Sequence, residues 1–204
     1  MDANHTRPTG RLEAFSDGVF AIAITLLVLD IKVPHALPEG VRLTAALLGQ
    51  WPAYVAFLSS FATIGIMWIN HHRLFDHIVR ADHTLFLLNL LLLLAISVVP
   101  FPTSLVAEYV LGPEGWVAAM IYAGMGLLIA VCFNLLWRYA ASRPRLLDPE
   151  VDPRVVQGIS QQYVFGPIVY LVAFALAWVN VTASLLLVLG LAVFFALPSW
   201  RATG

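Results

Sequence analysis

Six apolar stretches, each about as long as one bilayer crossing, constrain the fold of this chain more than any other feature. A helix needs roughly 20 mostly apolar residues to cross a hydrocarbon core of about 30 Å. The stretches that meet this requirement run approximately over residues 12–32, 43–72, 83–108, 114–140, 157–178 and 182–198. Because no Gly/Ser-rich linker or low-complexity tract divides them, the sequence predicts one all-α transmembrane domain of six helices over residues 1–204.

Prolines predict irregularities inside this pattern. Pro52 lies near the start of the second stretch, where a missing N–H is tolerated. Pro100 and Pro102 should kink or break the third stretch near its far end. The fifth and sixth stretches are joined so tightly, at residues 178–181, that they should form an antiparallel hairpin.

The composition excludes several classes of function. Only 11% of the residues are charged and 60% are hydrophobic, whereas soluble domains carry about 25% charged residues, so the lipid bilayer is the expected environment. A formal net charge of -1 provides no basic surface for nucleic acid. Neither an HExxH nor a GxSxG motif occurs, and no enzyme is expected. The single cysteine, Cys132, lies in an apolar run and is expected to be a small core residue.

The distribution of basic residues predicts the orientation in the membrane, because cytoplasmic loops are enriched in Lys and Arg. With six spans, both termini and the loops 73–82 and 141–156 share one side. That side collects all the basic residues except Lys32 and Arg42. Both termini are therefore expected to be cytoplasmic.

The first helix has a charged and polar beginning, with Arg11, Ser16 and Asp17 ahead of an almost unbroken apolar run. A charged group inside a membrane helix is costly and indicates a function. The second helix ends on the same side of the membrane with Trp68, Asn70, His71 and His72. We expect an ionised Asp17 to be satisfied by Arg11, a histidine or the Trp68 indole. This polar group either clamps the first helix to the second or contacts ions directly, and the sequence leaves both open.

Further along the first helix, Ile22, Thr25, Leu26 and Leu29 share one face, because their spacing follows the helical period. For most transmembrane helices such a stripe faces lipid or packs against a neighbour. Here the polar beginning of the helix and the small residues beside the stripe favour a second interpretation, since apolar constrictions gate pores by excluding water.

The histidines do not predict a metal site. His71, His72, His77 and His83 lack a cysteine or a paired acid at a spacing that zinc sites use. Adjacent histidines on a helix also point roughly 100° apart. No metal or other cofactor is expected.

The first helix resembles a known signature. RLEAFSDGVFAIAITLLVLDI is similar to the Arg-x-x-x-Phe-Ser-Asp motif and apolar run of the transmembrane protein 175 family of potassium channels, with Arg11, Phe15, Ser16 and Asp17 as the motif residues. The stretch WINHHR at residues 68–73 is similar to the end of that family's second helix, and six helices in about 200 residues match its prokaryotic members.

The resemblance implies a homotetramer in a prokaryotic plasma membrane, with the first helices of four chains lining a pore for K⁺. It implies that Ile22 forms the main constriction, that Leu26 and Leu29 extend it, and that Thr25 contributes with Ile22 to selectivity. The residues implied to hold the pore helix are Arg11, Ser16, Asp17, Trp68, Asn70, His71 and His72.

Two functions follow from this sequence. The first is a passive, potassium-preferring cation channel. The alternative is a proton-coupled secondary transporter with Asp17 and His71 as its relay, since acids and histidines inside membranes often carry protons. The absence of an inverted repeat in the sequence counts against the transporter.

Overall fold

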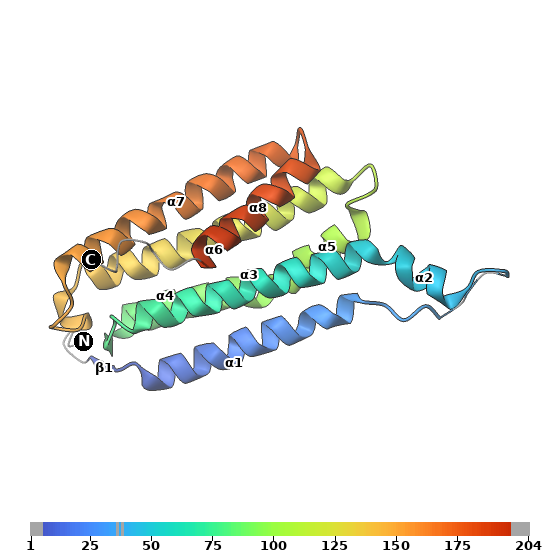
Figure 1. Ribbon diagram of the computed structural model, residues 1–204. Coiled ribbons are helices and arrows are strands. Elements are labelled where there is room, and N and C mark those ends of the chain that lie inside the picture. Colours follow the sequence, from blue (N-terminus) through green and yellow to red (C-terminus); the bar gives the residue numbers. More distant parts are fainter. Residues whose placement is uncertain (1–5, 36, 38, 197–204) are drawn as a thin grey trace.

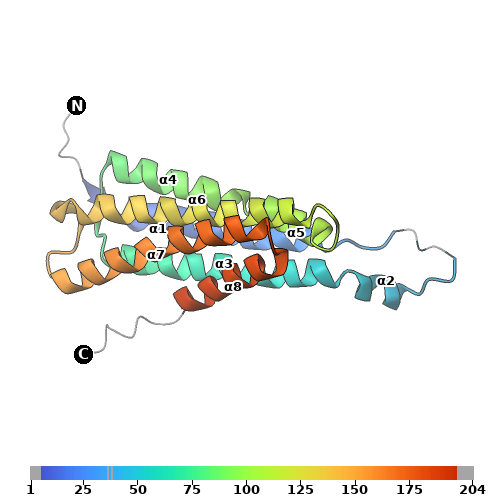
Figure 2. The same cartoon turned by 90° about the horizontal axis from the view of Figure 1, so that it is seen from above.

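A computed structural model describes residues 6–35, 37 and 39–196, and its longer elements are all helices (Figures 1 and 2). In chain order the elements are β1 (Arg7–Pro8), α1 (Gly10–Leu26), the 3-10 turn η1 (Leu27–Asp30), α2 (Leu43–Gly49), α3 (Trp51–Phe75), β2 (Arg80–Ala81), α4 (His83–Val98), α5 (Pro100–Tyr109), α6 (Gly115–Ala141), the 3-10 turn η2 (Pro144–Leu146), α7 (Pro153–Ala177) and α8 (Val181–Ala196). Strands β1 and β2 form a two-residue antiparallel pair that pairs Arg7 with Ala81.

The first predicted helix begins two residues earlier than expected and tightens into η1 before it ends at Asp30. Ile31, which follows, has an extended backbone. One face of α1 and η1 is buried, and its residues recur every three or four positions as an amphipathic helix requires. These buried residues are Leu12, Ser16, Phe20, Ala23 and Leu27.

The second predicted helix, 43–72, is two helices in the structure. The short α2 ends at Gly49 and α3 begins at Trp51, because Pro52 has no N–H to continue the helical hydrogen bonds across the junction. Figure 1 shows α2 and the loop before it extending beyond the end of the bundle. Helix α3 then continues three residues past the predicted end, to Phe75.

The third predicted helix, 83–108, is broken where the prolines indicated. Helix α4 ends at Val98 and α5 begins at Pro100, with Val99 between them. Asp82 caps the start of α4 by accepting a 3.0 Å hydrogen bond from the Leu85 N–H. Helix α4 packs against α1 and α6, and α5 packs against α3, α6 and η1.

Helix α6 begins one residue after the predicted start at 114 and ends one residue after the predicted end at 140, whereas α7 begins four residues before its predicted start at 157. The reason is a local signal: the Asp152 carboxylate accepts a 2.7 Å hydrogen bond from the Arg154 N–H, and Pro153 occupies the first helical position. The sixth helix, predicted at 182–198, is described from Val181 to Ala196, and residues 197–198 lie outside the described residues.

Gly126 of α6 and Pro167 of α7 both lie at the close contact between these two helices. A Cβ at Gly126 would lie 2.2 Å from the Tyr170 ring, so only glycine allows this approach. Pro167 inside α7 cannot donate to the Tyr163 carbonyl four residues earlier. The Asn134 side chain of α6 donates a 2.9 Å hydrogen bond to that carbonyl instead.

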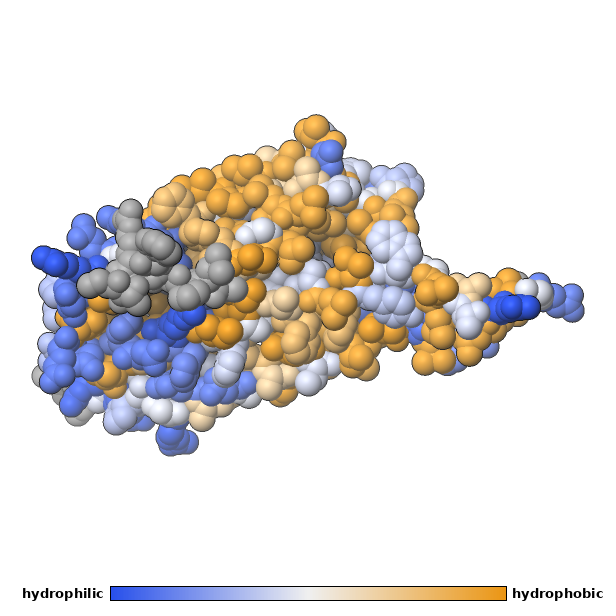
Figure 3. Space-filling view, in the orientation of Figure 1, coloured by the Kyte–Doolittle hydropathy of each residue, from blue (hydrophilic) through white to orange (hydrophobic). Residues whose placement is uncertain are grey.

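Five helices in the described part of the chain are long and apolar enough to cross a membrane, with α4 and α5 counted together as one crossing. Helix α8 has 16 residues and is shorter. Figure 3 shows apolar residues covering the middle of the bundle and hydrophilic residues gathered at the end where β1 lies. In Figure 1, α1 occupies one flank and α7 the opposite flank.

A polar cluster ties together the hydrophilic end of the bundle. The Asp82 carboxylate accepts from the Tyr139 hydroxyl of α6 at 2.8 Å and from the Arg145 guanidinium of η2 at 3.0 Å, in addition to its capping bond. Burial of the carboxylate opposes its charge, but the Leu85, Tyr139 and Arg145 donors outweigh burial and hold the pKa of Asp82 below its ordinary value. This cluster joins α4, α6 and η2.

Candidate functional site

The outward face of α1 carries the predicted stripe. Ile22, Leu26 and Leu29 are 61%, 42% and 64% exposed, and Thr25 is exposed between them. The Thr25 hydroxyl donates a 2.9 Å hydrogen bond to the Ile22 carbonyl, so the hydroxyl is satisfied within its own helix. The stripe is therefore apolar in its side chains, with one hydroxyl group at its centre.

The exposed stripe continues toward the beginning of the helix through Gly18, Phe15 and Arg11. These residues precede Ile22 by four, seven and eleven positions, which places all of them on one face. A face that combines a charged residue with bulky apolar ones is expensive to present to lipid along its whole length.

The buried face of α1 is fastened by a hydrogen-bonded chain through α4 to α3. The Asn89 side chain donates to the Ser16 hydroxyl at 3.0 Å, and its carbonyl oxygen lies 2.9 Å from the His71 ring nitrogen. The Ser16 hydroxyl donates in turn to the Leu12 carbonyl at 2.8 Å. All three side chains are buried, so the chain satisfies polar groups that would otherwise be costly in the interior.

Aromatic rings fix the orientation of His71 in this chain of hydrogen bonds. The His71 ring stacks on Phe75 with 4.6 Å between centroids, and Phe20 of α1 lies 5.5 Å from it on a tilted plane. One ring nitrogen is therefore directed to Asn89 while the faces of the ring contact apolar neighbours. Sequence reasoning identified Ser16 and His71 but missed Asn89, although a lone amide in a leucine-rich helix is the signal that could have indicated it.

A second contact joins α1 to α3 at the surface. The Trp68 indole N–H donates a 2.8 Å hydrogen bond to an Asp17 carboxylate oxygen, as one of the predicted alternatives required. The His72 ring stacks beside the Trp68 ring with 6.2 Å between centroids. Asp17 and His71 thus each bond a different residue, and no hydrogen bond joins the two side chains.

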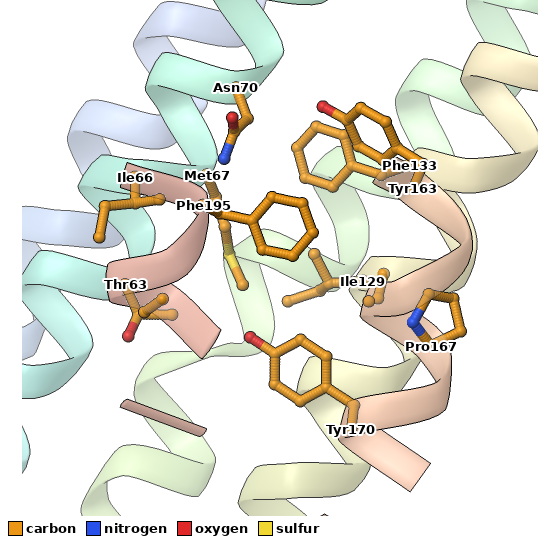
Figure 4. A pocket seen from close by; sticks show the side chains of 13 residues that line it. Thr63, Ile66, Met67, Asn70, Ile129, Phe133, Tyr163, Pro167, Tyr170 and Phe195 are labelled. Carbon is orange, nitrogen blue, oxygen red and sulfur yellow. The ribbon is translucent and has the colours of Figure 1, made fainter. Parts of the chain in front are cut away.

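Two residues of the predicted polar group lie elsewhere. Arg11 forms no hydrogen bond or ion pair with Asp17, because six residues advance a helix by 600°, about 120° short of two turns. Asn70 points away from α1 into a pocket of about 50 Å³ between α3, α6, α7 and α8 (Figure 4). Tyr170 and Thr63 also line that pocket, which does not touch the exposed stripe.

The histidines do not gather with other ligating groups. Within the residues that the structure describes, no three His, Cys, Asp or Glu side chains come close enough together to hold a metal ion. Cys132 is buried in α6 and belongs to the apolar core around α1, α4 and α6.

Comparison with known proteins agrees with this architecture. The sequence model of a family described as endosomal/lysosomal potassium channel TMEM175 matches residues 11–100. A protein of Chamaesiphon minutus named as a potassium channel is 54% identical over 200 residues, which are 98% of this chain and 98% of that protein. The chain belongs to the TMEM175 family. The resemblance seen in the first helix is confirmed.

A second relative and a solved structure are also similar to this chain over most of its length. A protein of Streptomyces collinus, also named as a potassium channel, is 44% identical over 178 residues, 87% of this chain and 86% of that protein. A crystal structure of a lysosomal potassium-selective channel TMEM175 homolog from Chamaesiphon minutus matches with a TM-score of 0.85 at 53% identity, over 92% of this chain and 96% of that chain. The predicted all-helical membrane fold is thereby confirmed, and these relatives are named as channels and not as enzymes.

Proposed function

We propose that this chain is a potassium-preferring cation channel in which α1 and η1 of several copies line the pore. The observation that carries the proposal is the exposed stripe of Ile22, Thr25, Leu26 and Leu29 on a helix whose opposite face is fastened to the bundle. The names of the TMEM175 relatives from Chamaesiphon minutus and Streptomyces collinus support potassium as the permeant ion.

A pore requires more than one copy of the chain. A single bundle with one such helix at its flank cannot enclose a channel, whereas copies arranged around an axis would turn their α1 stripes toward one another. The number four, a homotetramer, is the one that the sequence resemblance implies. This arrangement also removes Arg11, which is exposed on the same face as the stripe, from contact with lipid, where charged side chains are costly.

The stripe would act as the gate. Rings of Ile22, Leu26 and Leu29 would form a narrow apolar throat that excludes water when closed and opens by a small rotation or dilation of the helices. Ile22 is the main constriction in this proposal, and Thr25 contributes to selectivity with it. K⁺ passes transiently, and no cofactor or bound metal takes part.

In the proposed topology, residues 1–204 form one domain that crosses the membrane six times. The membrane is the plasma membrane of a prokaryotic cell, and both termini lie in the cytoplasm. Helix α8 spans about 24 Å at 1.5 Å per residue, shorter than a 30 Å core. A bilayer that thins locally accommodates a helix of this length. The hydrophilic end of the bundle, with Arg80 and Arg145, is the cytoplasmic end by the same charge rule.

The proposal is tested by electrical recording of the purified protein in a planar bilayer under opposed K⁺ and H⁺ gradients. A potassium channel reverses near the K⁺ equilibrium potential. A proton-coupled transporter reverses at a potential set by its coupling stoichiometry, and that result would reject the channel. The particle mass in detergent, measured in the same preparation, tests the tetramer.

A further inference from the structure

The outer end of the proposed pore helix is held by a hydrogen bond of its own, separate from the chain of hydrogen bonds at Ser16. Asp30 is the last residue of η1, and its carboxylate oxygen Oδ1 accepts a hydrogen bond from the Ser104 hydroxyl of α5. Asp30 directly follows Leu29, the outermost residue of the exposed stripe. The contact therefore lies beside the last apolar ring of the proposed pore.

This hydrogen bond uses only one of the two Asp30 carboxylate oxygens. Asp30 Oδ2 is buried and has no hydrogen-bond partner among the residues that the structure describes. Ser104 also lies 3.1 Å from the Pro100 carbonyl, so its one proton has a second acceptor available. Among the described residues, Ser104 is the one side chain that donates a hydrogen bond to the Asp30 carboxylate.

The segment that supplies Ser104 is anchored independently of α1. Next to Ser104, the Thr103 hydroxyl donates to the Ser60 hydroxyl of α3 at 2.8 Å, and the Ser60 hydroxyl lies 2.9 Å from the Tyr122 hydroxyl of α6. Helix α5 is thus tied to α3 and α6. A side chain on α5 can hold η1 because α5 itself is held.

The α4–α5 segment, which is interrupted at Val99, contacts both ends of the proposed pore helix. Asn89 on α4 contacts Ser16 at one end, and Ser104 on α5 contacts Asp30 at the other. The interruption at Val99 lies between the two fastenings. A change of angle at this break would therefore move the outer end of the pore helix relative to its inner end.

We propose that the Asp30–Ser104 contact is a positioning contact that holds the outer end of the pore helix and keeps the ring of Leu29 side chains narrow. The inference rests on the proposed function, because it assigns a role to α1 and η1 as the pore lining. Asp30 and Ser104 act through the position of Leu29 and do not themselves contact the permeant ion.

Substitutions that break the contact test it in proteoliposomes loaded with K⁺. Ser104→Ala and Asp30→Leu should each raise passive K⁺ flux about fivefold, the shift expected when one hydrogen bond that favours the narrow state is lost. Asp30→Asn keeps an acceptor oxygen and should stay near the parent flux. Ser97→Ala is the matched control, because Ser97 donates only to the Leu94 carbonyl of its own helix.

Combining the Asp30 and Ser104 substitutions in one protein shows whether their effects on K⁺ flux come from one shared contact or from two independent ones. The double variant Asp30→Leu with Ser104→Ala should show no more flux than either single variant, because both remove the same hydrogen bond. Multiplied effects in the double variant, or an Asp30→Asn variant that behaves like Asp30→Leu, would overturn the inference. Ser104→Ala and Asp30→Leu variants whose K⁺ flux equals that of the parent would also overturn it.

A reversible covalent link tests the same contact without relying on destabilised variants. In a Cys132→Ala background, Asp30→Cys with Ser104→Cys should form a disulfide that keeps K⁺ flux at or below the parent level. Reduction should then raise the flux to that of Ser104→Ala in the same vesicles. Equal flux before and after reduction would overturn the positioning contact, whereas a parent protein without K⁺ flux would overturn the proposed function.

Discussion

The Trp68 indole N–H donates to an Asp17 carboxylate oxygen over 2.8 Å and thereby joins α3 to α1 at the surface of the bundle. This contact accompanies the buried chain from Ser16 through Asn89 to His71, one helical turn or less away along both helices. Together the two contacts fix the inner part of α1. The apolar stripe beyond them carries no such polar contact to the rest of the bundle.

The contact at Asp17 is expected to contribute to assembly more than to ion selection. Trp68→Phe, which keeps an aromatic ring and removes the donor, should destabilise the folded protein by about 1 kcal/mol, a modest value because both groups are exposed. Asp17→Asn should act in the same direction. The yield of intact oligomer in detergent and the K⁺ to Na⁺ flux ratio check this together.

Trp178→Phe is the control for the loss of an indole, because Trp178 is exposed at the end of α7 and packs only against Trp116 among the aromatic rings described. An intact oligomer with collapsed selectivity in Asp17→Asn would show that Asp17 acts in permeation instead.

The buried chain of hydrogen bonds is expected to be more costly to break. Asn89→Leu leaves the Ser16 hydroxyl and the His71 ring nitrogen without their buried partner, and we expect a loss of about 2–4 kcal/mol. The shift of the thermal unfolding midpoint measures it. Replacing Ser16 by Ala as well should add less than its separate effect, and fully additive losses would contradict the shared chain.

A dependence of stability on acid pH is expected from Asp82. Its pKa in the folded protein lies below the ordinary value of 3.8, so the stabilisation is fully present above that value and is lost as the pH falls through the lower folded pKa. Unfolding midpoints measured between neutral pH and about pH 3 should therefore decline more in the parent than in Asp82→Asn. Tyr139→Phe should reduce the acid-dependent part, and an unchanged acid profile in Asp82→Asn would refute the assignment.

Thr25 tests how ions are distinguished. Its hydroxyl is bonded to the Ile22 carbonyl, so Thr25→Ser should keep the K⁺ over Na⁺ preference, whereas Thr25→Val, of nearly the same shape, should weaken it. The ratio of K⁺ to Na⁺ permeability from reversal potentials measures the effect, which we expect to be about threefold for one hydroxyl group per chain. Identical ratios for Val and Ser would assign selectivity to the apolar rings alone.

The sequence predicted the parts of this structure that arise from local physics. Apolar length predicted the long helices, and Pro100 predicted the break between α4 and α5. It did not predict which polar side chains meet across helices, because the rotation of each helix is decided by packing. Asn89 and Ser104 were missed for this reason. Of the three partners expected for Asp17, the structure shows Trp68, whereas Arg11 lies about 120° away around the helix.

Boundaries also depended on small capping signals. The start of α7 was predicted four residues late, because the Asp152 and Pro153 pair was not recognised as a helix start. The separation of α2 from α3 was missed because Pro52 was treated as tolerated within the first turn of one longer helix.

The most direct test of the account is passive K⁺ flux through proteoliposomes that contain Ile22→Ala, Ile22→Val or the parent protein. Ile22→Ala should raise the flux at least about tenfold, because it removes about 2 kcal/mol of apolar contact per chain from the constriction. It should also weaken the preference for K⁺ over Na⁺. Ile22→Val keeps an apolar ring and should stay within about twofold of the parent. Val28→Ser is the control, because Val28 is exposed but lies about a third of a turn from the stripe. An Ile22→Ala flux equal to that of the parent, in an intact oligomer, would contradict the claim that this face of α1 lines the pore.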